Sequence, residues 1–324
     1  MVRVIADDDV DRLLDLDSLL GVVADAFRAQ RDGTVERPDR PHFPLGAGLD
    51  PEDADRALGT GLAMPAYVHG AATYATKVAS VHEENPARGL PTVHAQVLVA
   101  DAATGEPRAL LAGERVTNAR TGCIGGLAVA HLARTQVTLA VFGAGTQARW
   151  QTRAVATATD VDAVAVYSPS DSRHECATDL DATLDADVRP AESPADALDD
   201  ANAIVTATTS TEPVFEAADC PDGAVVVAVG AYTPEMQELD AETVERATRV
   251  YADVPEEAVA TGDLAGRIER DDVRPFADAF DAQRVAPDEL VVVESVGSAV
   301  LDAATADWLL ERAVGDGVGR DVPL

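Results

Sequence analysis

The sequence predicts an α/β protein in which a doubly wound parallel sheet is joined to an α+β domain. From residue 135 onward, apolar runs rich in β-branched residues alternate with helical stretches, which is typical of a parallel sheet buried on both faces. The first of these runs leads through a glycine-rich loop directly into a helix. The N-terminal third has a different texture, with a proline-rich stretch and segments of alternating polar and apolar residues.

The N-terminal third predicts one helix followed by an antiparallel arrangement of strands. Residues 16–32 have the periodicity of an amphipathic helix. The segment 37–44 is expected to be extended because each proline restricts both itself and its predecessor. Alternating strands are predicted at residues 59–68, 72–80, 92–101 and, after a hairpin turn at 103–107, 108–111.

The remainder of the chain predicts the parallel sheet and two flanking helices. A helix rich in small residues is expected at 117–134, and a closing helix at 297–314 returns to the first domain. We therefore divide the chain into a first domain, residues 1–116 and 300–324, and a second domain, residues 117–299. The six buried strands are predicted at residues 137–142, 161–167, 203–207, 224–229, 249–252 and 290–293.

The chain is strongly acidic and almost free of lysine. It has 57 acidic and 25 basic residues, for a formal net charge of −32, and Lys77 is its single lysine. Such a surface repels phosphate backbones and anionic lipids, which excludes nucleic acid and membrane surfaces as partners. Because salt at 1 M shortens the Debye length to about 3 Å and relieves self-repulsion, we hypothesise a halophilic protein. Ordinary acidic solubilisation is the alternative.

The cysteines predict a reducing compartment. Cys123, Cys176 and Cys220 are odd in number, far apart and without CxxC spacing, which argues against a disulfide framework or a zinc site. No spacing of acidic residues indicates a metal-binding loop, so no metal is expected. The N-terminus has no apolar signal region, and the longest apolar run, residues 224–229, is too short to span a bilayer. We therefore expect a soluble, cytoplasmic protein.

The loop after the first buried run has the pattern GxGxxA. Gly143 permits the tight turn, Gly145 lets a pyrophosphate approach the backbone, and Ala148 packs the following helix against the strand. The helix N-terminus adds free N–H groups and a partial positive charge. Because the loop stands at the head of six α/β units, it predicts a Rossmann domain that binds NAD(H) or NADP(H). The expected cofactor contacts are Gly143, Ala144, Gly145, Thr146, Gln147 and Ala148.

The end of the second buried run bears on which dinucleotide binds. NAD enzymes usually place an acidic residue there to bind the ribose 2′-hydroxyl. Here Ser168 and Ser170 follow the run, and Arg173 lies nearby. This composition favours a 2′-phosphate and hence NADP(H), whereas Asp171 leaves NAD(H) open.

A series of motifs in fixed order extends over nearly the whole chain. They are Met64-Pro65, the spacing from Lys77 to Thr92, Asp101-x-x-Thr-Gly105, Thr117 to Gly122, the Gly143–Ala148 loop, Gly230 to Asp240, and Glu294 to Ser298. In these motifs the sequence resembles the ornithine cyclodeaminase/μ-crystallin family, which includes archaeal alanine dehydrogenases and ketimine reductases. The resemblance implies that residues 117–299 form a dinucleotide-binding Rossmann domain and that residues 1–116 and 300–324 form a substrate-binding and dimerisation domain. It therefore also implies a homodimer.

The resemblance also implies the positions of the site residues. It places the carboxylate of a small amino or imino acid on Arg40, Lys77 and Arg120, with Thr92 close by. Arginine alone can bind a carboxylate bidentately. A partly desolvated ammonium near other cations can also exchange a proton near neutrality, which arginine cannot do. We therefore predict that Lys77 and Arg120 are catalytic. The resemblance assigns further cofactor contacts to Gly230, Ser295 and Gly297.

Two positions bear on the chemistry. By resemblance, cyclodeaminases carry an aspartate after the fourth Rossmann strand and a glutamate shortly before Met-Pro. Here the first position falls on Tyr232, and the second segment reads Leu62-Ala-Met-Pro65. Tyr232, our third predicted catalytic residue, suits a substrate with a small or cyclic apolar side chain.

These residues favour an oxidoreductase that transfers hydride between nicotinamide and the C–N carbon of a small amino or imino acid, as alanine dehydrogenases and ketimine reductases do. Ornithine cyclisation to proline with release of ammonia is the alternative, with Glu235 or Glu83 as possible substitutes for the missing acids. A non-catalytic NADP-binding protein is a second alternative.

Overall fold

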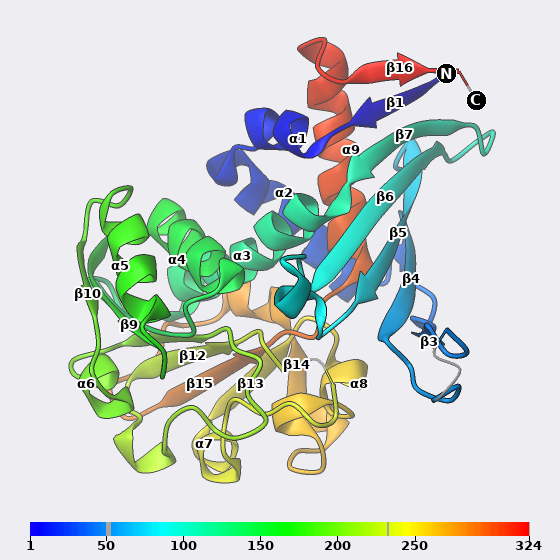
Figure 1. Ribbon diagram of the computed structural model, residues 1–324. Helices are drawn as coiled ribbons and strands as arrows, with labels where there is room; N and C mark the ends of the chain where they lie inside the picture. The colour runs from blue at the N-terminus through cyan, green and yellow to red at the C-terminus, as the bar shows by residue number, and fades with distance from the viewer. Residues whose placement is uncertain (50–52, 232, 324) are drawn as a thin grey trace. The chain divides into compact units, whose positions relative to one another are not determined.

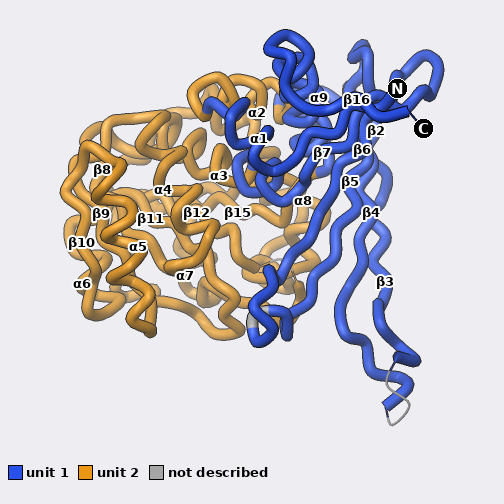
Figure 2. The backbone as a smooth tube through the Cα atoms, turned by 45° about the horizontal axis from the view of Figure 1, so that its top comes forward, with its two compact units in different colours: residues 1–15, 28–120, 299–324 blue, residues 16–27, 121–298 orange. Residues whose placement is uncertain are grey.

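The computed structural model describes residues 1–49, 53–231 and 233–323, and the chain divides into two compact units (Figure 2). Unit 1 consists of Met1–Asp15, Arg28–Arg120 and Ala299–Leu324, and unit 2 consists of Leu16–Phe27 and Thr121–Ser298. The sequence-based boundaries differ from these at residues 16–27, which belong to unit 2, and at residues 117–120 and 299, which belong to unit 1.

Unit 2 is built on one sheet of eight parallel strands in the order β10-β9-β8-β11-β12-β15-β13-β14. The order reverses between β8 and β11, and in such sheets ligands bind at the carboxyl ends of the strands beside this switch point. The α/β doubly wound fold predicted from the sequence is therefore confirmed. The strands are β8 (Val137–Phe142), β9 (Val161–Tyr167), β10 (Asp187–Pro190), β11 (Ala203–Thr206), β12 (Ala224–Ala228), β13 (Arg249–Ala252), β14 (Val273–Pro275) and β15 (Leu290–Glu294).

All six predicted runs are strands, but the two edge strands, β10 and β14, were missed. Both are short, partly exposed and end in proline, so they lack the continuous apolar pattern of a central strand. The inner strands pack a continuous apolar row on one face of the sheet. Residues in register along it are Ala140, Ile204, Val226, Val292 and Val250.

Short helices connect the strands of unit 2 (Figure 1). The α-helices are α4 (Thr146–Ala158), α5 (Ser172–Asp181), α6 (Pro194–Leu198), α7 (Ala241–Arg246) and α8 (Pro255–Ala258). The 3₁₀-helices are η2 (Ala217–Asp219), η3 (Gly262–Leu264), η4 (Arg270–Asp272) and η5 (Phe276–Asp281). Helices α2 (Leu16–Arg31) and α3 (Gly113–Leu132) contain residues of both units and match the predicted helices at 16–32 and 117–134.

Unit 1 contains a largely antiparallel sheet in the order β16-β1-β7-β6-β5-β4-β2, with β3 also paired to β4. Its only parallel pair among the described residues is β1 with β7. The strands are β1 (Val2–Ile5), β2 (Val35–Glu36), β3 (His42–Leu45), β4 (Gly59–Val68), β5 (Thr73–Val81), β6 (Val93–Asp101), β7 (Pro107–Ala112) and β16 (Arg320–Val322). The helices are α1 (Asp7–Leu13), α9 (Ala299–Gly315) and the 3₁₀-helix η1 (Asn85–Arg88).

Helix α9, the predicted closing helix, packs against β4, β5 and β6 (Figure 1). Side chains alternate along β5, so that Ala75, Lys77 and Ala79 are buried while Tyr74 and Val78 are exposed. The strand period thus turns Lys77 towards the covered side of the sheet. None of the described helices has both the length and the apolarity that crossing a bilayer requires.

Candidate active site

The glycine loop of unit 2 has the backbone that its sequence predicts. Gly143 has φ +110°, and a Cβ at this position would lie 2.4 Å from the carbonyl oxygen of Ala207. Its N–H donates to the carbonyl of Tyr167 at 2.9 Å. Only glycine combines this conformation with so close an approach of neighbouring strand ends, so the turn after β8 depends on Gly143.

Gly145 is the N-cap of α4, and a Cβ built on it meets no atom within 4 Å. The N-terminus of this 13-residue helix therefore faces open space, where its first N–H groups and partial positive charge can hold a phosphate. Gly145 and Thr146 are exposed there, while Ala148 is fully buried against the sheet. The residues present fit a dinucleotide pyrophosphate.

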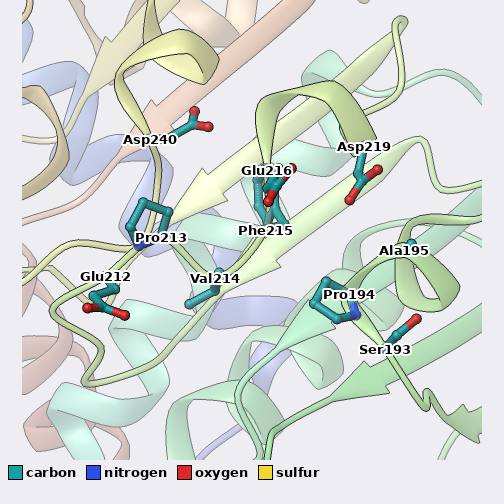
Figure 3. A pocket seen from close by; sticks show the side chains of 10 residues that line it. All are labelled: Ser193, Pro194, Ala195, Glu212, Pro213, Val214, Phe215, Glu216, Asp219 and Asp240. Atoms are coloured by element: carbon teal, nitrogen blue, oxygen red, sulfur yellow. The ribbon is translucent and has the colours of Figure 1, made fainter.

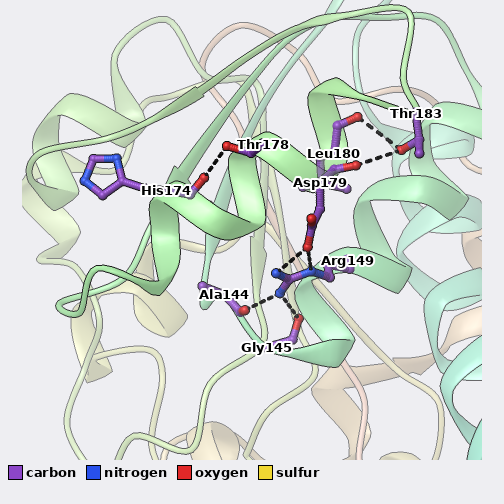
Figure 4. A network of polar contacts seen from close by, with 8 residues as sticks. All are labelled: Ala144, Gly145, Arg149, His174, Thr178, Asp179, Leu180 and Thr183. Carbon is purple, nitrogen blue, oxygen red and sulfur yellow. Dashed lines mark hydrogen bonds and ion pairs between the residues drawn. The ribbon is translucent and has the colours of Figure 1, made fainter.

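Arg149 supports this loop from its carbonyl side, which the sequence did not reveal. Its guanidinium donates to the carbonyl oxygens of Ala144 and Gly145 (Figure 4). The same group is bound by Asp179 of α5, with Nε and Nη2 at 3.0 and 2.8 Å from the carboxylate. Because its carbonyls are held in this way, the loop presents its N–H groups in a fixed direction.

Three serine hydroxyls gather after β9. Ser168 Oγ lies 3.3 Å from Ser170 Oγ, which lies 2.6 Å from Ser172 Oγ. Arg173 donates through Nη1 to the carbonyls of Ser168 and Ser170 and also pairs with Glu192 at 3.4 Å. The structure therefore brings the predicted ribose-side residues together.

The predicted cofactor residue Gly230 is bound tightly to a buried carboxylate. Its N–H donates to Glu238 at 2.7 Å, and the same carboxylate accepts from Thr208 N at 2.6 Å and Thr206 Oγ1 at 2.8 Å. A Cβ on Gly230 would lie 2.3 Å from the carbonyl of Thr208. Glu238 thus ties together the segments that follow β11 and β12, a role that the sequence did not indicate.

Ser295 and Gly297, the other predicted cofactor residues, are held by Asp253. The Ser295 hydroxyl and the Gly297 N–H each donate to Asp253 Oδ2 at 2.7 Å, and Val296 N donates to Oδ1 at 3.0 Å. Asp253 follows β13 and lies one strand away from the end of β15. It therefore fixes the course of the segment to which both predicted residues belong.

In unit 1 the predicted residues Lys77 and Arg120 meet at a third residue, Asp302 of α9. Lys77 Nζ lies 2.7 Å from Asp302 Oδ2, and Arg120 Nε donates to Oδ1 at 2.9 Å. The three residues are 4%, 4% and 1% exposed. Thr117, one turn before Arg120 on α3, accepts from Lys77 Nζ at 3.3 Å. Asp302 was not predicted from the sequence, where its one signal is an acid within an apolar stretch of a predicted helix.

The protonation of this cluster follows from burial and from charge. Burial lowers the pKa of Lys77 from 10.5 to about 8; Asp302 opposes this shift, and Arg120 and Arg40 add to it. Burial by itself raises the pKa of Asp302, but Arg120 and then Lys77 outweigh it and hold the pKa below its usual value. At neutral pH the cluster therefore contains a carboxylate and an ammonium that is ready to give up a proton.

Two further predicted substrate residues are placed less closely, and one lies outside the described residues. Arg40, half-buried just before β3, is near enough to lower the pKa of Lys77. Thr92 precedes β6, and in the described part of the chain its hydroxyl makes no hydrogen bond with Lys77 or Arg120. Tyr232 lies outside the described residues.

A cavity of about 700 Å³ in unit 2 is lined by none of the predicted site residues (Figure 3). Asp240, one of the residues that line this cavity, already accepts hydrogen bonds from Thr243 N at 2.7 Å and Ala217 N at 3.0 Å. The acidic lining of the cavity repels phosphates, so the cavity is unsuited to the cofactor's pyrophosphate. The acidic residues lining it are Glu212, Glu216, Asp219 and Asp240. No group of three or more metal-ligating side chains occurs among the residues that the structure describes.

The parallel sheet, its switch point and the glycine loop define a protein with a Rossmann-type dinucleotide-binding unit. The chain belongs to the ornithine cyclodeaminase/mu-crystallin family, whose model matches residues 2–317. The resemblance stated from the motifs is thus confirmed at the level of the family.

Three similar proteins bear on function. The chain is 34% identical to a Delta(1)-pyrroline-2-carboxylate reductase of Bacillus cereus over 275 residues, 81% of this chain and 84% of the relative. Its fold matches the Thermococcus litoralis Delta(1)-pyrroline-2-carboxylate reductase in complex with NADH and L-proline, with TM-score 0.91 and 28% identity over 99% of this chain and 100% of the other. It also matches an archaeal alanine dehydrogenase dimer with bound NAD, with TM-score 0.87 and 28% identity over 100% and 99% of the chains.

Proposed function

We propose that this protein is an NAD(P)(H)-dependent oxidoreductase that acts on the C=N or CH–NH₂ group of a small amino or imino acid. The observation that supports this most directly is the buried group of Lys77, Arg120 and Asp302. It holds two cations in one place, and one of them, Lys77, can also donate a proton. Similarity to pyrroline-2-carboxylate reductases and to an alanine dehydrogenase supports the same reaction class.

The two cations of the cluster have different roles in this reaction. Arg120, with Arg40 nearby, binds the substrate carboxylate through guanidinium N–H groups. Lys77 gives a proton to the substrate nitrogen during reduction and takes one back during oxidation. A pKa of about 8 suits a group that must work in both directions near neutral pH. The nicotinamide, when bound, supplies or accepts the hydride.

For the substrate, we favour a five- or six-membered cyclic imine carboxylate or the imine of pyruvate. Tyr232 is proposed as a neutral wall of the substrate site and as its third catalytic residue. Thr92 is proposed to contact the substrate carboxylate once substrate is bound. The cyclodeaminase alternative requires a carboxylate for the distal ammonium of ornithine, and the sequence has no acid at the two positions where that carboxylate is expected.

For the cofactor, we propose a preference for NADP(H) over NAD(H). The hydroxyls of Ser168 and Ser170 and the guanidinium of Arg173 are the groups that a 2′-phosphate requires, and no acid directly follows β9. The structural relatives hold NADH and NAD, which makes the comparison of the two cofactors a direct test. Ser168→Asp is expected to shift the ratio of kcat/KM values towards NADH.

We also propose that two copies associate through the outer face of the unit 1 sheet. Neighbouring strands place Val78, Leu98 and Leu110 on this face with 52%, 43% and 39% of their surfaces exposed, and Leu98 lies in register with Leu110. A contiguous apolar patch on a sheet face indicates an interface. Sedimentation of Leu98→Glu is expected to show a monomer where the native protein is a dimer.

The acidic surface supports a working environment of high salt. Carboxylates at this density repel one another unless the solution screens them. We expect the protein to unfold at a lower temperature in dilute buffer than in molar KCl. Equal stability in both would leave ordinary acidic solubilisation as the explanation. Its three cysteines are free and buried, which agrees with the proposed cytoplasmic location.

The reaction is tested by following nicotinamide absorbance in molar KCl. NADH and NADPH are offered separately with Delta(1)-pyrroline-2-carboxylate, a six-membered cyclic imine carboxylate, and pyruvate plus ammonium. We expect oxidation of the cofactor with at least one imine, and the substrate giving the highest kcat/KM defines the class. Failure with every imine but ammonia release from ornithine would support the cyclodeaminase; failure in both assays would support a binding protein.

A further inference from the structure

We propose that Asp302 is a positioning residue that gives Lys77 and Arg120 different tasks in the reaction. By holding one position on each cation, it leaves the guanidinium fork of Arg120 for the substrate carboxylate and a single Nζ position of Lys77 for proton exchange. This inference rests on the proposed function, and it adds a residue that the motifs did not single out.

The carboxylate of Asp302 is divided between the two cations. Its Oδ1 accepts from Arg120 Nε at 2.9 Å, and its Oδ2 lies 2.7 Å from Lys77 Nζ. Helix α9 packs against β5 (Figure 1), and the side chain of Asp302 on this helix is 1% exposed. A rigid, fully buried anion with one oxygen for each partner fixes both partners in orientation.

The atom that Arg120 uses decides what remains available. A guanidinium has five N–H donors in a planar fork. The contact to Asp302 uses Nε, and in the described part of the chain no hydrogen bond from Nη1 or Nη2 of Arg120 is found. These two nitrogens form one of the edges through which a guanidinium binds a carboxylate bidentately, and it is the edge that does not include Nε. Asp302 therefore turns the binding edge of Arg120 away from itself.

Lys77 is restricted in a similar way. Thr117 donates its hydroxyl hydrogen to the carbonyl of Gly113 at 2.7 Å, so its oxygen accepts from Lys77 Nζ at 3.3 Å. Asp302 and Thr117 account for at most two of the three N–H bonds of an ammonium. One position on Nζ is left, and it becomes a lone pair when the proton leaves. Proton exchange with the substrate nitrogen takes place at that position.

Asp302 also balances charge. Lys77 is faced by Arg120 from α3, by Arg40 from the segment before β3, and by Asp302 from α9, and only Asp302 favours its protonated form. Without this carboxylate, two buried cations would lie side by side with no anion until substrate binds. When Asp302 is present, binding of the substrate carboxylate gives the group of Lys77, Arg120, Asp302 and substrate carboxylate a net charge of zero.

The single lysine of this chain allows a direct test. Protein labelled with [¹³Cε]lysine gives one lysine resonance, that of Lys77, whose titration is followed by NMR without cofactor or substrate. In Asp302→Asn we expect the titration midpoint to fall by about one pH unit or more, because one compensating charge is lost. The pH at which kcat of imine reduction declines is expected to move by the same amount.

Asp307→Asn is the matched control. Asp307 lies on the same helix and accepts from Thr73 Oγ1 of β5 at 2.6 Å, so this variant loses a helix-to-strand contact outside the cluster. The titration midpoint of Lys77 in this variant, and its kcat and KM, are expected to equal those of the native protein. Asp302→Glu retains the charge but moves it by one methylene; we expect a native midpoint with kcat lowered at least about tenfold by misplacement.

Identical lysine midpoints in native protein and a folded Asp302→Asn variant would overturn the proposal. If Asp302→Asn does not fold, Asp302→Glu decides, because native kcat in that variant would likewise contradict positioning. Absence of imine reduction by the native protein would remove the proposed function instead. The lysine titration would still report whether Asp302 governs the proton on Lys77.

Discussion

The two units of the protein each bury a group of ionisable side chains, and the two groups behave in opposite ways. The basic cluster of unit 1 consists of Lys77, Arg120 and Asp302. The acidic cluster of unit 2 consists of Glu238, Asp263 and Glu294, all 0% exposed at the carboxyl ends of the sheet. Burial is nearly equal in the two clusters, so the difference between them comes from neighbouring charge.

The pKa of a carboxyl group is lowered in one cluster and raised in the other. In the basic cluster, two cations outweigh burial and hold the pKa of Asp302 below its usual value. In the acidic cluster, burial and neighbouring carboxylates raise the pKa of Glu294 well above its usual value, and Arg267 only partly opposes them. Burial likewise raises the pKa of Glu238 to about 7 despite its hydrogen bonds. The charge of the neighbouring side chains, and not the depth of burial alone, therefore decides whether a buried carboxyl group is ionised.

The difference separates two kinds of work. A charged cluster with unused N–H groups can bind a substrate anion and move a proton. A cluster of carboxyl groups cannot attract an anion, but its oxygens accept backbone hydrogen bonds. Glu238 accepts from Thr208 and Gly230, and Asp263 Oδ1 accepts from the N–H groups of Glu238 and Leu239 at 2.7 and 2.8 Å. The acidic cluster therefore fixes the loops at the carboxyl ends of the inner strands.

The strongest test of the basic cluster is Lys77→Arg, which preserves charge and removes proton exchange. We expect kcat for imine reduction to fall by about 10²- to 10⁴-fold, the usual contribution of general acid–base catalysis. Arg108→Lys, the reverse exchange at an arginine whose side chain is 51% exposed, serves as the control and should retain native kcat. Activity of Lys77→Arg within twofold of native would show that charge alone suffices.

Around the acidic cluster, the largest effect on stability is expected from Gly230→Ala, because Gly230 contacts Glu238. The new methyl carbon would lie 2.3 Å from the Thr208 carbonyl and 2.5 Å from Glu238 Oε1. Since both contacts are far below van der Waals distance, we expect the free energy of unfolding to fall by about 2–3 kcal/mol. The control is Gly145→Ala, which meets no atom within 4 Å and should leave stability nearly unchanged. Urea unfolding of the three proteins in molar KCl measures the difference.

The two clusters are also expected to make stability depend on pH with opposite signs. Between pH 4.5 and about 7, native Glu238 keeps a proton that the unfolded chain has lost, so stability falls as pH rises. Between about pH 8 and 10.5, native Lys77 has lost a proton that the unfolded chain retains, so stability rises with pH. Each slope amounts to about 1.4 kcal/mol per pH unit for one proton.

These slopes are obtained by subtracting the pH profiles of Glu238→Gln and Lys77→Met from that of the native protein. The subtraction removes the titration of the many surface carboxylates, which are common to all three chains. A difference profile for Glu238→Gln that is flat from pH 4.5 to 7 would contradict the protonation of this carboxyl group in the native state.

The smallest effect is expected at Glu294. Neither of its carboxyl oxygens has a hydrogen-bond partner among the described residues, and its pKa is raised well above the usual value. Glutamine replaces a protonated carboxyl group by a neutral group of the same shape, so at pH 6 we expect Glu294→Gln to change stability by less than about 1 kcal/mol. A loss as large as that in Gly230→Ala would mean that Glu294 is ionised and paired.

Local pattern sufficed for most of the fold. Continuous β-branched runs identified the six inner strands of unit 2. Side-chain alternation identified β4, β5 and β6, and the hairpin turn at residues 103–107 led to β7. The edge strands were not predicted because they are short, partly exposed and end in proline. The assignment of residues 16–27 to unit 2 also escaped, since helical periodicity shows that a face is buried but not against what.

By itself the sequence determined the glycine loop, whose backbone conformation is a local property of Gly143 and Gly145, and it singled out Lys77 as the lone lysine. The tertiary structure alone revealed the partners that give these residues their properties. Asp302 lies 182 residues from Arg120, and Glu238 lies 32 residues from Thr206. No pattern of spacing encodes such pairs, because they arise when a helix packs on a sheet and brings together charges whose protonation then depends on one another.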